Sequence, residues 1–154
     1  MNSSIIARTL TIAAVAALVL GFSPKAKANC SEATLKGHHF AYTSTGSAVA
    51  APIPPSSWGP YVEVGVQYFD GNGNITFTYN MSQNGNIGPG TATGTYKVND
   101  DCTGKFTETS EGSTSHFSFV IDSDGTQFQA ICQDPGIVIT QTARRQFLRD
   151  DREW

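Results

Sequence analysis

Three tyrosines could bring their hydroxyl groups together inside this protein. Tyr68, Tyr79 and Tyr96 each alternate in phase with apolar residues on successive predicted strands. Because a buried phenol needs a hydrogen-bond partner, such phenols among phenylalanines could bind a small, flat, mostly apolar molecule. The candidate ligand-binding residues are Tyr68, Phe77, Tyr79, Tyr96, Phe117, Phe119 and Phe128. The alternative is that these rings simply fill the core.

A carboxylate among these rings would have a raised pKa and could transfer protons. Glu63 is the strand acid that the sequence places near them. It alternates with Val62 and Val64, which we expect to face the interior, so Glu63 should lie on the opposite face. We therefore assign no catalytic residue.

The histidines and the acidic turns do not have the spacing of a metal site. His38 and His39 are adjacent in a predicted strand and so face opposite sides, and His116 is distant in sequence. Segments 70–74 and 122–125 resemble fragments of calcium loops without the later ligands, and tight turns explain their Asp, Asn and Gly residues. We predict no metal and no cofactor.

The elements that carry these residues have a period of two, which is typical of strands. Gly-rich turns such as Asp70–Gly73 separate them and indicate hairpins. We expect an all-β fold, a single antiparallel up-and-down barrel, because closure removes both exposed sheet edges. A two-sheet sandwich is the alternative, and the proline-rich segment 46–60 should be a loop over one end. The eight expected strands are 33–45, 61–68, 75–81, 91–99, 105–111, 117–121, 128–132 and 137–145.

The first 28 residues have the pattern of a signal peptide. Arg8 precedes the apolar run Leu10–Phe22, and Ala26-Lys27-Ala28 matches a cleavage site. The apolar run is shorter than the roughly 20 residues that span a bilayer, so we expect no membrane span in the mature chain. The predicted organisation is a signal peptide (1–28), a barrel domain (29–147) and a charged tail (148–154), secreted or periplasmic after cleavage near Ala28.

The net charge and the cysteine content limit the classes of partner and the cellular compartment that we expect. Cleavage would remove three basic residues and no acid, which changes the formal net charge from −3 to −6. Nucleic acid is therefore not an expected partner, because it requires clustered basic residues. Cys30, Cys102 and Cys132 all remain after cleavage, and in an oxidising compartment two of them should form a disulfide. Three pairings are possible.

The chain also resembles a family of small secreted bacterial proteins without an assigned function. The resemblance is carried by Cys30-Ser31-x-Ala33-Thr34-Leu35-x-Gly37, by Phe69-Asp70-Gly71-Asn72-Gly73, by Gly94-Thr95-Tyr96-x-Val98-x-x-Asp101-Cys102-Thr103-Gly104, by Asp134-Pro135-Gly136 and by Arg144-Arg145-Gln146. It implies a disulfide between Cys30 and Cys102, with Cys132 as the free thiol. The architecture and the Gly-Thr-Tyr strand are more distantly similar to the barrel of allene oxide cyclases and dirigent proteins.

We therefore expect a secreted, non-enzymatic barrel that binds a small apolar or aromatic ligand or associates with the cell envelope. A cofactor-free cyclase or isomerase of allene oxide cyclase type is the enzymatic alternative. A purely structural protein is the third. A cavity would favour the first two, and a buried carboxylate facing that cavity would favour the enzyme. The sequence does not predict an oligomeric state.

Overall fold

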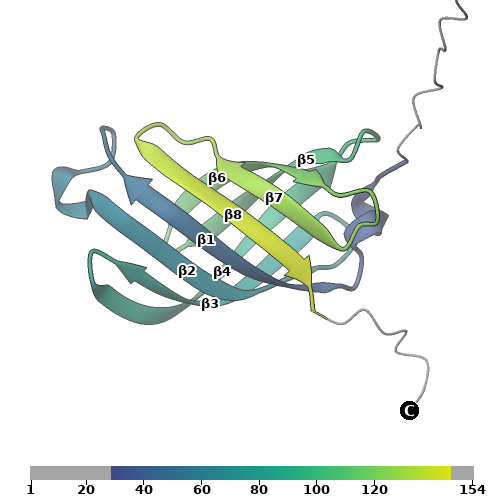
Figure 1. Cartoon of the computed structure of the whole chain (residues 1–154), viewed down its shortest axis with the longest axis horizontal. Coiled ribbons are helices and arrows are strands. Elements are labelled where there is room, and N and C mark those ends of the chain that lie inside the picture. The colour runs from purple at the N-terminus through teal and green to yellow at the C-terminus, as the bar shows by residue number, and fades with distance from the viewer. Residues whose placement is uncertain (1–28, 147–154) are drawn as a thin grey trace, which may run out of the picture.

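The computed structural model describes residues 29–146, and the predicted signal peptide and charged tail lie outside the described residues. The described chain is an all-β domain (Figure 1). Two short 3₁₀ helices, η1 (Glu32–Leu35) and η2 (Pro55–Ser57), accompany the strands. The strands are β1 (His39–Ala48), β2 (Gly59–Phe69), β3 (Asn74–Gln83), β4 (Asn86–Val98), β5 (Thr103–Ser110), β6 (Ser113–Ile121), β7 (Gln127–Cys132) and β8 (Ile137–Arg145).

The eight strands form a closed barrel in sequence order, and every neighbouring pair is antiparallel. The first strand also pairs with the last, from Phe40 opposite Arg145 to Ala48 opposite Ile137, and this pairing closes the barrel. The predicted up-and-down barrel is therefore confirmed, and the sandwich alternative is not. No helix among residues 29–146 is long and apolar enough to cross a membrane.

The turn after β2 shows how local sequence sets the hairpins. Gly71 and Gly73 have φ angles of 80° and 96°, which favour glycine. Asp70 accepts hydrogen bonds at Oδ1 from the backbone nitrogens of Asn72 at 2.7 Å and Asn74 at 3.0 Å. The carboxylate thus organises the turn itself, as the turn interpretation of this motif predicts.

Two expected boundaries were wrong at the ends of β1. Residues 32–35 form η1 rather than the beginning of a strand, and β1 starts at His39. The strand then continues to Ala48, into the segment expected to be a loop. Gly46 permits this extension, because a Cβ there would lie 1.9 Å from the carbonyl oxygen of Val138 on β8.

The inner face that the sequence predicted for β2 was also wrong, because the side chains expected to face the interior face outwards. Val62 and Val64 are 45% and 51% exposed and Tyr68 is 36% exposed, so these side chains face outwards. Glu63, Gln67 and Phe69 face the interior and are buried; Glu63 is 1% exposed. The physical reason is that the barrel interior is polar at this level, so the apolar residues of β2 do not mark its inner face.

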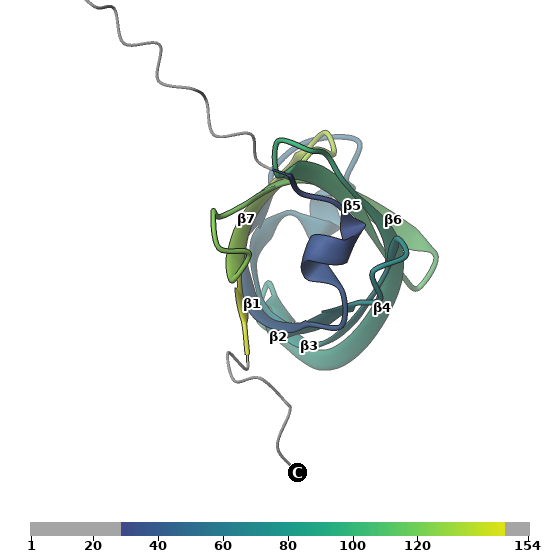
Figure 2. The same cartoon turned by 90° about the vertical axis from the view of Figure 1, so that its right-hand side faces the viewer.

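The barrel has two unlike halves. One half, called here the closed half, holds an aromatic core, and η1 lies across its end with Leu35 fully buried (Figure 2). The disulfide between Cys30 and Cys102 attaches the segment before η1 to the turn after β4, whereas Cys132 is a buried free cysteine. The cysteine pairing implied by the family resemblance is therefore present. The other half, called here the open half, lies beneath residues 49–58.

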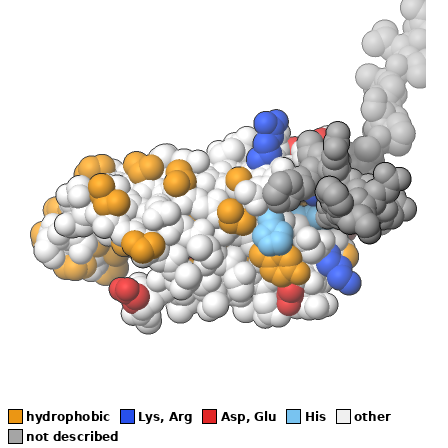
Figure 3. All heavy atoms as spheres, turned by 90° about the horizontal axis from the view of Figure 1, so that it is seen from below, with side chains coloured by type: hydrophobic (Ala, Val, Ile, Leu, Met, Phe, Trp, Pro, Cys, Tyr) orange, Lys and Arg blue, Asp and Glu red, His pale blue; other side chains and the backbone are white. Residues whose placement is uncertain are grey.

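One face of the outer surface carries few charged side chains. Figure 3 shows this face, with hydrophobic side chains scattered over it and more of these towards the end that is on the left in Figure 1. Threonines occupy much of the outer face, as their β-branched side chains suit a half-solvated strand. The carboxyl, phenol and amide groups of interest lie inside the barrel.

Candidate functional site

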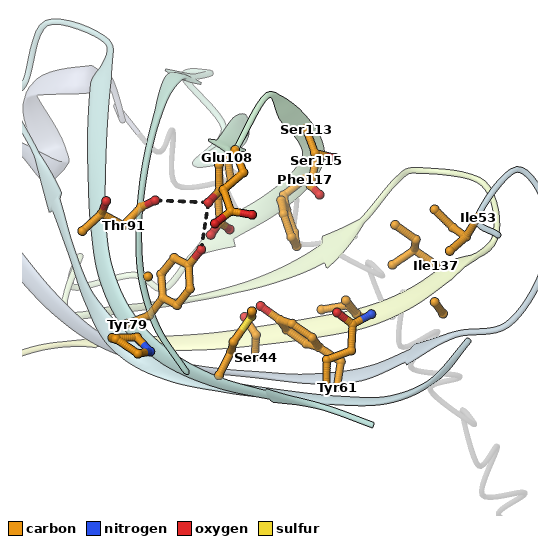
Figure 4. A pocket seen from close by; sticks show the side chains of 18 residues that line it. Ser44, Ile53, Tyr61, Tyr79, Thr91, Glu108, Ser113, Ser115, Phe117 and Ile137 are labelled. Atoms are coloured by element: carbon orange, nitrogen blue, oxygen red, sulfur yellow. Dashed lines mark hydrogen bonds between the residues drawn. The ribbon is translucent and has the colours of Figure 1, made fainter. Parts of the chain in front are cut away.

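A cavity of about 740 Å³ occupies the open half of the barrel (Figure 4). Ile53 of the proline-rich segment belongs to its lining, and Phe117 belongs both to the lining and to the aromatic core. Among residues 29–146 the lining consists of Ser44, Ala48, Ile53, Tyr61, Tyr79, Met81, Gln83, Pro89, Gly90, Thr91, Glu108, Ser110, Glu111, Ser113, Ser115, Phe117, Ile137 and Ile139. The cavity is thus built from β1–β6 and β8 together with Ile53 of segment 49–58.

One side of the cavity is polar. The Tyr79 hydroxyl donates to Ser110 Oγ at 3.1 Å, and Ser110 Oγ donates to the carbonyl oxygen of Thr91 at 3.2 Å (Figure 4). Gly90 lets the Tyr79 ring lie flat against β4, because a Cβ at Gly90 would lie 2.3 Å from that ring. The phenol is therefore fixed in position at the cavity wall.

The opposite side of the cavity is apolar. Figure 4 shows Ile53 and Ile137 on the side away from Tyr79 and Glu108. Ala48 and Ile139 also belong to the lining. A ligand that fills the cavity would therefore contact aliphatic side chains at one end and hydrogen-bonding groups at the other.

Glu63 lies beneath the cavity, where it is held by two phenols. The Tyr42 hydroxyl donates to one carboxylate oxygen and the Tyr61 hydroxyl donates to the other. Burial raises the pKa of Glu63, and the two hydrogen bonds oppose that rise because they favour the ionised form. Burial and the adjacent carboxylate also raise the pKa values of Tyr42 and Tyr61, so both phenols stay protonated and act as donors.

Glu108 on β5 is the carboxyl group that faces the cavity directly (Figure 4). Burial, with a smaller contribution from the negative charge of Glu63, raises its pKa to about 8. Among residues 29–146 no group hydrogen-bonds to its carboxyl. Glu108 is therefore a largely protonated acid at neutral pH, with its hydrogen-bonding capacity available to a ligand.

A chain of buried amides completes the boundary between the two halves. Gln67 Nε2 donates to Gln141 Oε1 at 3.3 Å, and Gln141 Nε2 donates to Ser44 Oγ at 3.1 Å. Gln67 Oε1 has no partner although the side chain is fully buried. Together with Tyr42 and Glu63, these residues form what we call the polar layer, which separates the aromatic core from the cavity.

The structure brings only part of the expected ligand-binding set to the cavity. Tyr79 and Phe117 line it. Tyr96 lies in the closed half, where its hydroxyl donates to the carbonyl oxygen of Glu32 in η1 at 3.0 Å. Tyr68 lies outside the barrel, with its ring 4.8 Å from that of His39 between centroids. The other members, Phe77, Phe119 and Phe128, belong to the aromatic core.

Sequence reasoning missed Glu108, Tyr61 and Ser44. A signal for Glu108 was present, since it shares its strand phase with Phe106, which is 2% exposed inside the barrel. Tyr61 and Glu63 were missed because the valines of β2 suggested the wrong inner face. Ser44 was missed because its neighbours in the sequence are mostly small or polar and do not alternate with apolar residues.

The part of the cavity lining that the described chain provides contains two acids, Glu108 and Glu111, and no Lys, Arg or His. Within residues 29–146 no group of three or more His, Cys, Asp or Glu side chains is arranged to hold a metal ion. The ionisable groups of the site are thus carboxyls and phenols.

No protein-family model, no curated protein and no solved structure matches this chain. The all-β barrel is therefore the level at which the chain can be classified.

Tyr96 provides a test of how η1 is held. We expect Tyr96→Phe to lower the free energy of unfolding by about 1 kcal/mol, because it removes one hydrogen bond to η1 and keeps the ring. Urea denaturation at pH 7 would measure this loss. Since Tyr96 is absent from the cavity lining, an unchanged stability together with altered ligand binding would contradict the placement of this residue.

Proposed function

We propose that this chain is a binding protein for a small, mostly apolar ligand held in the open half of the barrel. The observation that carries the proposal is the cavity of about 740 Å³, with one aliphatic and one polar side. Ligand sites in proteins are concave, have volumes of a few hundred Å³ and combine apolar walls with a few placed polar groups. The cavity has each of these properties.

The division of the barrel interior supports binding over a purely structural role. An eight-stranded barrel can be filled by its own side chains, and the closed half is filled in this way. The polar layer ends this packing and leaves space above it. A barrel that served only as a scaffold would gain stability from apolar residues at Glu63, Gln67 and Gln141.

The site of action is proposed to be outside the cytoplasm. The Cys30–Cys102 disulfide supports an oxidising compartment, in which such bonds form and persist. The signal peptide proposed for residues 1–28 agrees with this location. Secretion or export to a periplasm would give the barrel access to small molecules at the cell surface.

A cavity-filling variant tests the proposal. Ser115 lines the cavity from β6, whereas Val120 on the same strand faces solvent. We expect the neutral dye N-phenyl-1-naphthylamine to bind the native protein with increased fluorescence, Ser115→Trp to reduce its affinity at least tenfold, and Val120→Trp to retain it. A folded Ser115→Trp variant that binds the dye as well as the native protein does would refute binding in this cavity.

A second candidate function is a cofactor-free isomerase or cyclase of allene oxide cyclase type. It is supported by Glu108, a carboxyl group that faces the cavity with a pKa of about 8 and could donate or accept a proton near neutral pH. Tyr79 lies on the same side of the cavity and could hydrogen-bond to a substrate oxygen. The similarity of the barrel architecture and of the Gly-Thr-Tyr strand to allene oxide cyclases is what suggests this type of reaction. The proposed family of small secreted proteins is based on sequence motifs and has no assigned function.

Proton exchange separates the two candidates. An isomerase should accelerate the exchange of deuterium from D₂O into the carbon next to the carbonyl of a bound ketone such as 2-decalone, and Glu108→Gln should abolish the acceleration. A pure binding protein should hold the same ketone without accelerating exchange.

A further inference from the structure

The charge distribution around the cavity is one-sided. Glu108 and Glu111 belong to the lining, and Glu63 lies directly beneath it. Among residues 29–146 no basic side chain lines the cavity. His116 Nδ1 and Asp134 Oδ1 lie 2.8 Å apart, and neither of these residues lines the cavity.

The carboxyl group of Glu63 is hydrogen-bonded but has no cationic partner among the described residues that contact it. Its two oxygens accept from Tyr42 and Tyr61, which supply dipoles and no positive charge. A buried carboxylate without a cation is energetically costly, and its field extends into the low-dielectric interior. A positively charged ligand group in the cavity above it could therefore complement these carboxyl groups.

Aromatic side chains in the lining also suit a positively charged ligand group. Tyr61, Tyr79 and Phe117 line the cavity, and aromatic rings can attract a cation. The aliphatic side formed with Ile53 and Ile137 suits an uncharged body. The lining thus provides for a positive group at one end and an apolar group at the other.

We propose that the cavity selects a ligand with a protonated amine at its polar end, next to Glu108, and an apolar or aromatic body against Ile53 and Ile137. This inference rests on the proposed binding function and adds the chemical class of the ligand. It excludes small carboxylates and phosphates, which would meet carboxyl groups without a basic partner.

The proton on Glu108 should make the binding of an amine depend on pH. The titratable groups near Glu108 in the described chain are Glu63 and Tyr61 from β2, Tyr42 from β1, Tyr79 from β3 and Glu111 after β5. None of these groups is cationic. An ammonium group beside Glu108 favours its ionised form, so binding below pH 8 should release a proton. The affinity for an amine should therefore rise as the pH increases from 6 to 8, while the amine itself remains protonated.

Three ligands that share one indole ring test the charge preference. Tryptamine carries an ammonium group, tryptophol carries a hydroxyl group, and indole-3-propionate carries a carboxylate. Displacement of N-phenyl-1-naphthylamine at pH 7.5 would measure their affinities. We expect tryptamine to bind at least tenfold more tightly than tryptophol, and indole-3-propionate to bind most weakly.

Two variants test whether Glu108 causes the preference for tryptamine over tryptophol. Glu108→Gln should bring the affinities for tryptamine and tryptophol within threefold of each other. Asp100→Asn makes the same change of charge on an exposed residue after β4, at the end of the barrel opposite to the cavity, and should keep the tenfold preference.

The outcomes separate this inference from the binding function. If tryptophol or indole-3-propionate binds as tightly as tryptamine while the dye still binds in the cavity, the amine preference is wrong and the binding function stands. If neither the dye nor any indole compound binds, both are wrong. A tenfold preference that persists in Glu108→Gln would overturn the role given to Glu108.

Discussion

Replacing Glu108 by glutamine should raise the free energy of unfolding at pH 9 by about 3 to 5 kcal/mol and leave it nearly unchanged at pH 4. In the unliganded native protein the pKa of Glu108 is about 8, compared with about 4.5 for an ordinary glutamate. Each unit of difference between the folded and unfolded states corresponds to about 1.4 kcal/mol. The amide keeps the shape of the side chain and removes its ionisation.

The direction of this effect follows from proton binding. Between pH 4.5 and 8 the folded protein holds a proton on Glu108 that the unfolded chain has released, so the stability falls as the pH rises through this range. Below pH 4.5 both states are protonated and the contribution of Glu108 is constant. Well above pH 8 Glu108 is ionised in both states, and the free energy of unfolding no longer changes with pH because of this residue.

Urea denaturation of both proteins between pH 4 and pH 9 would measure the difference. The exposed Asp70, whose pKa is lowered by its turn hydrogen bonds, contributes equally to both proteins and cancels in the comparison. Parallel stability curves for the native protein and Glu108→Gln would show that Glu108 is not buried in an unfavourable environment.

Removing the Cys30–Cys102 disulfide should lower the free energy of unfolding by about 4 kcal/mol. The bond spans 72 positions, and a loop of that length substantially restricts the unfolded chain in the chain-entropy model. For a domain of this size the melting temperature should fall by roughly 10 to 20 °C. The variant with both Cys30→Ala and Cys102→Ala, followed by circular dichroism during heating, would measure the fall.

Cys132 offers the matched control. It is a buried free thiol with no disulfide partner, so Cys132→Ala should retain the sensitivity of the melting temperature to reductant. The double variant should lose that sensitivity. A melting temperature that reductant lowers equally in all three proteins would contradict the disulfide as the source of the effect.

The barrel could be predicted from sequence because its signals are local and repeated. Alternation on β3, where Ile75, Phe77 and Tyr79 face inwards, gave the correct inner face, and the Asp70–Gly73 turn gave a correct hairpin. Closure could also be predicted, since a meander of eight strands otherwise exposes two edges. These inferences require only neighbouring residues and the strand period.

The candidate site was harder to predict because its residues contradict the rule that locates the core. On β2 the exposed positions are Val62 and Val64, while Glu63 and Gln67 are buried. Apolar residues normally mark the buried face, and a polar layer inside a barrel reverses that pattern. Only the pairing of Glu63 with phenols from β1 and β2 shows why the reversal is tolerated.

The pairing of β1 with β8 also governs when the barrel can form. Phe40 meets Arg145 across this seam, so the ends of the domain must both be present before the last set of strand hydrogen bonds can be made. Until then the growing sheet exposes two free edges that could pair with other chains. Contacts between positions so distant in sequence form slowly. For a chain that crosses a membrane unfolded, such a seam would delay folding until translocation is complete.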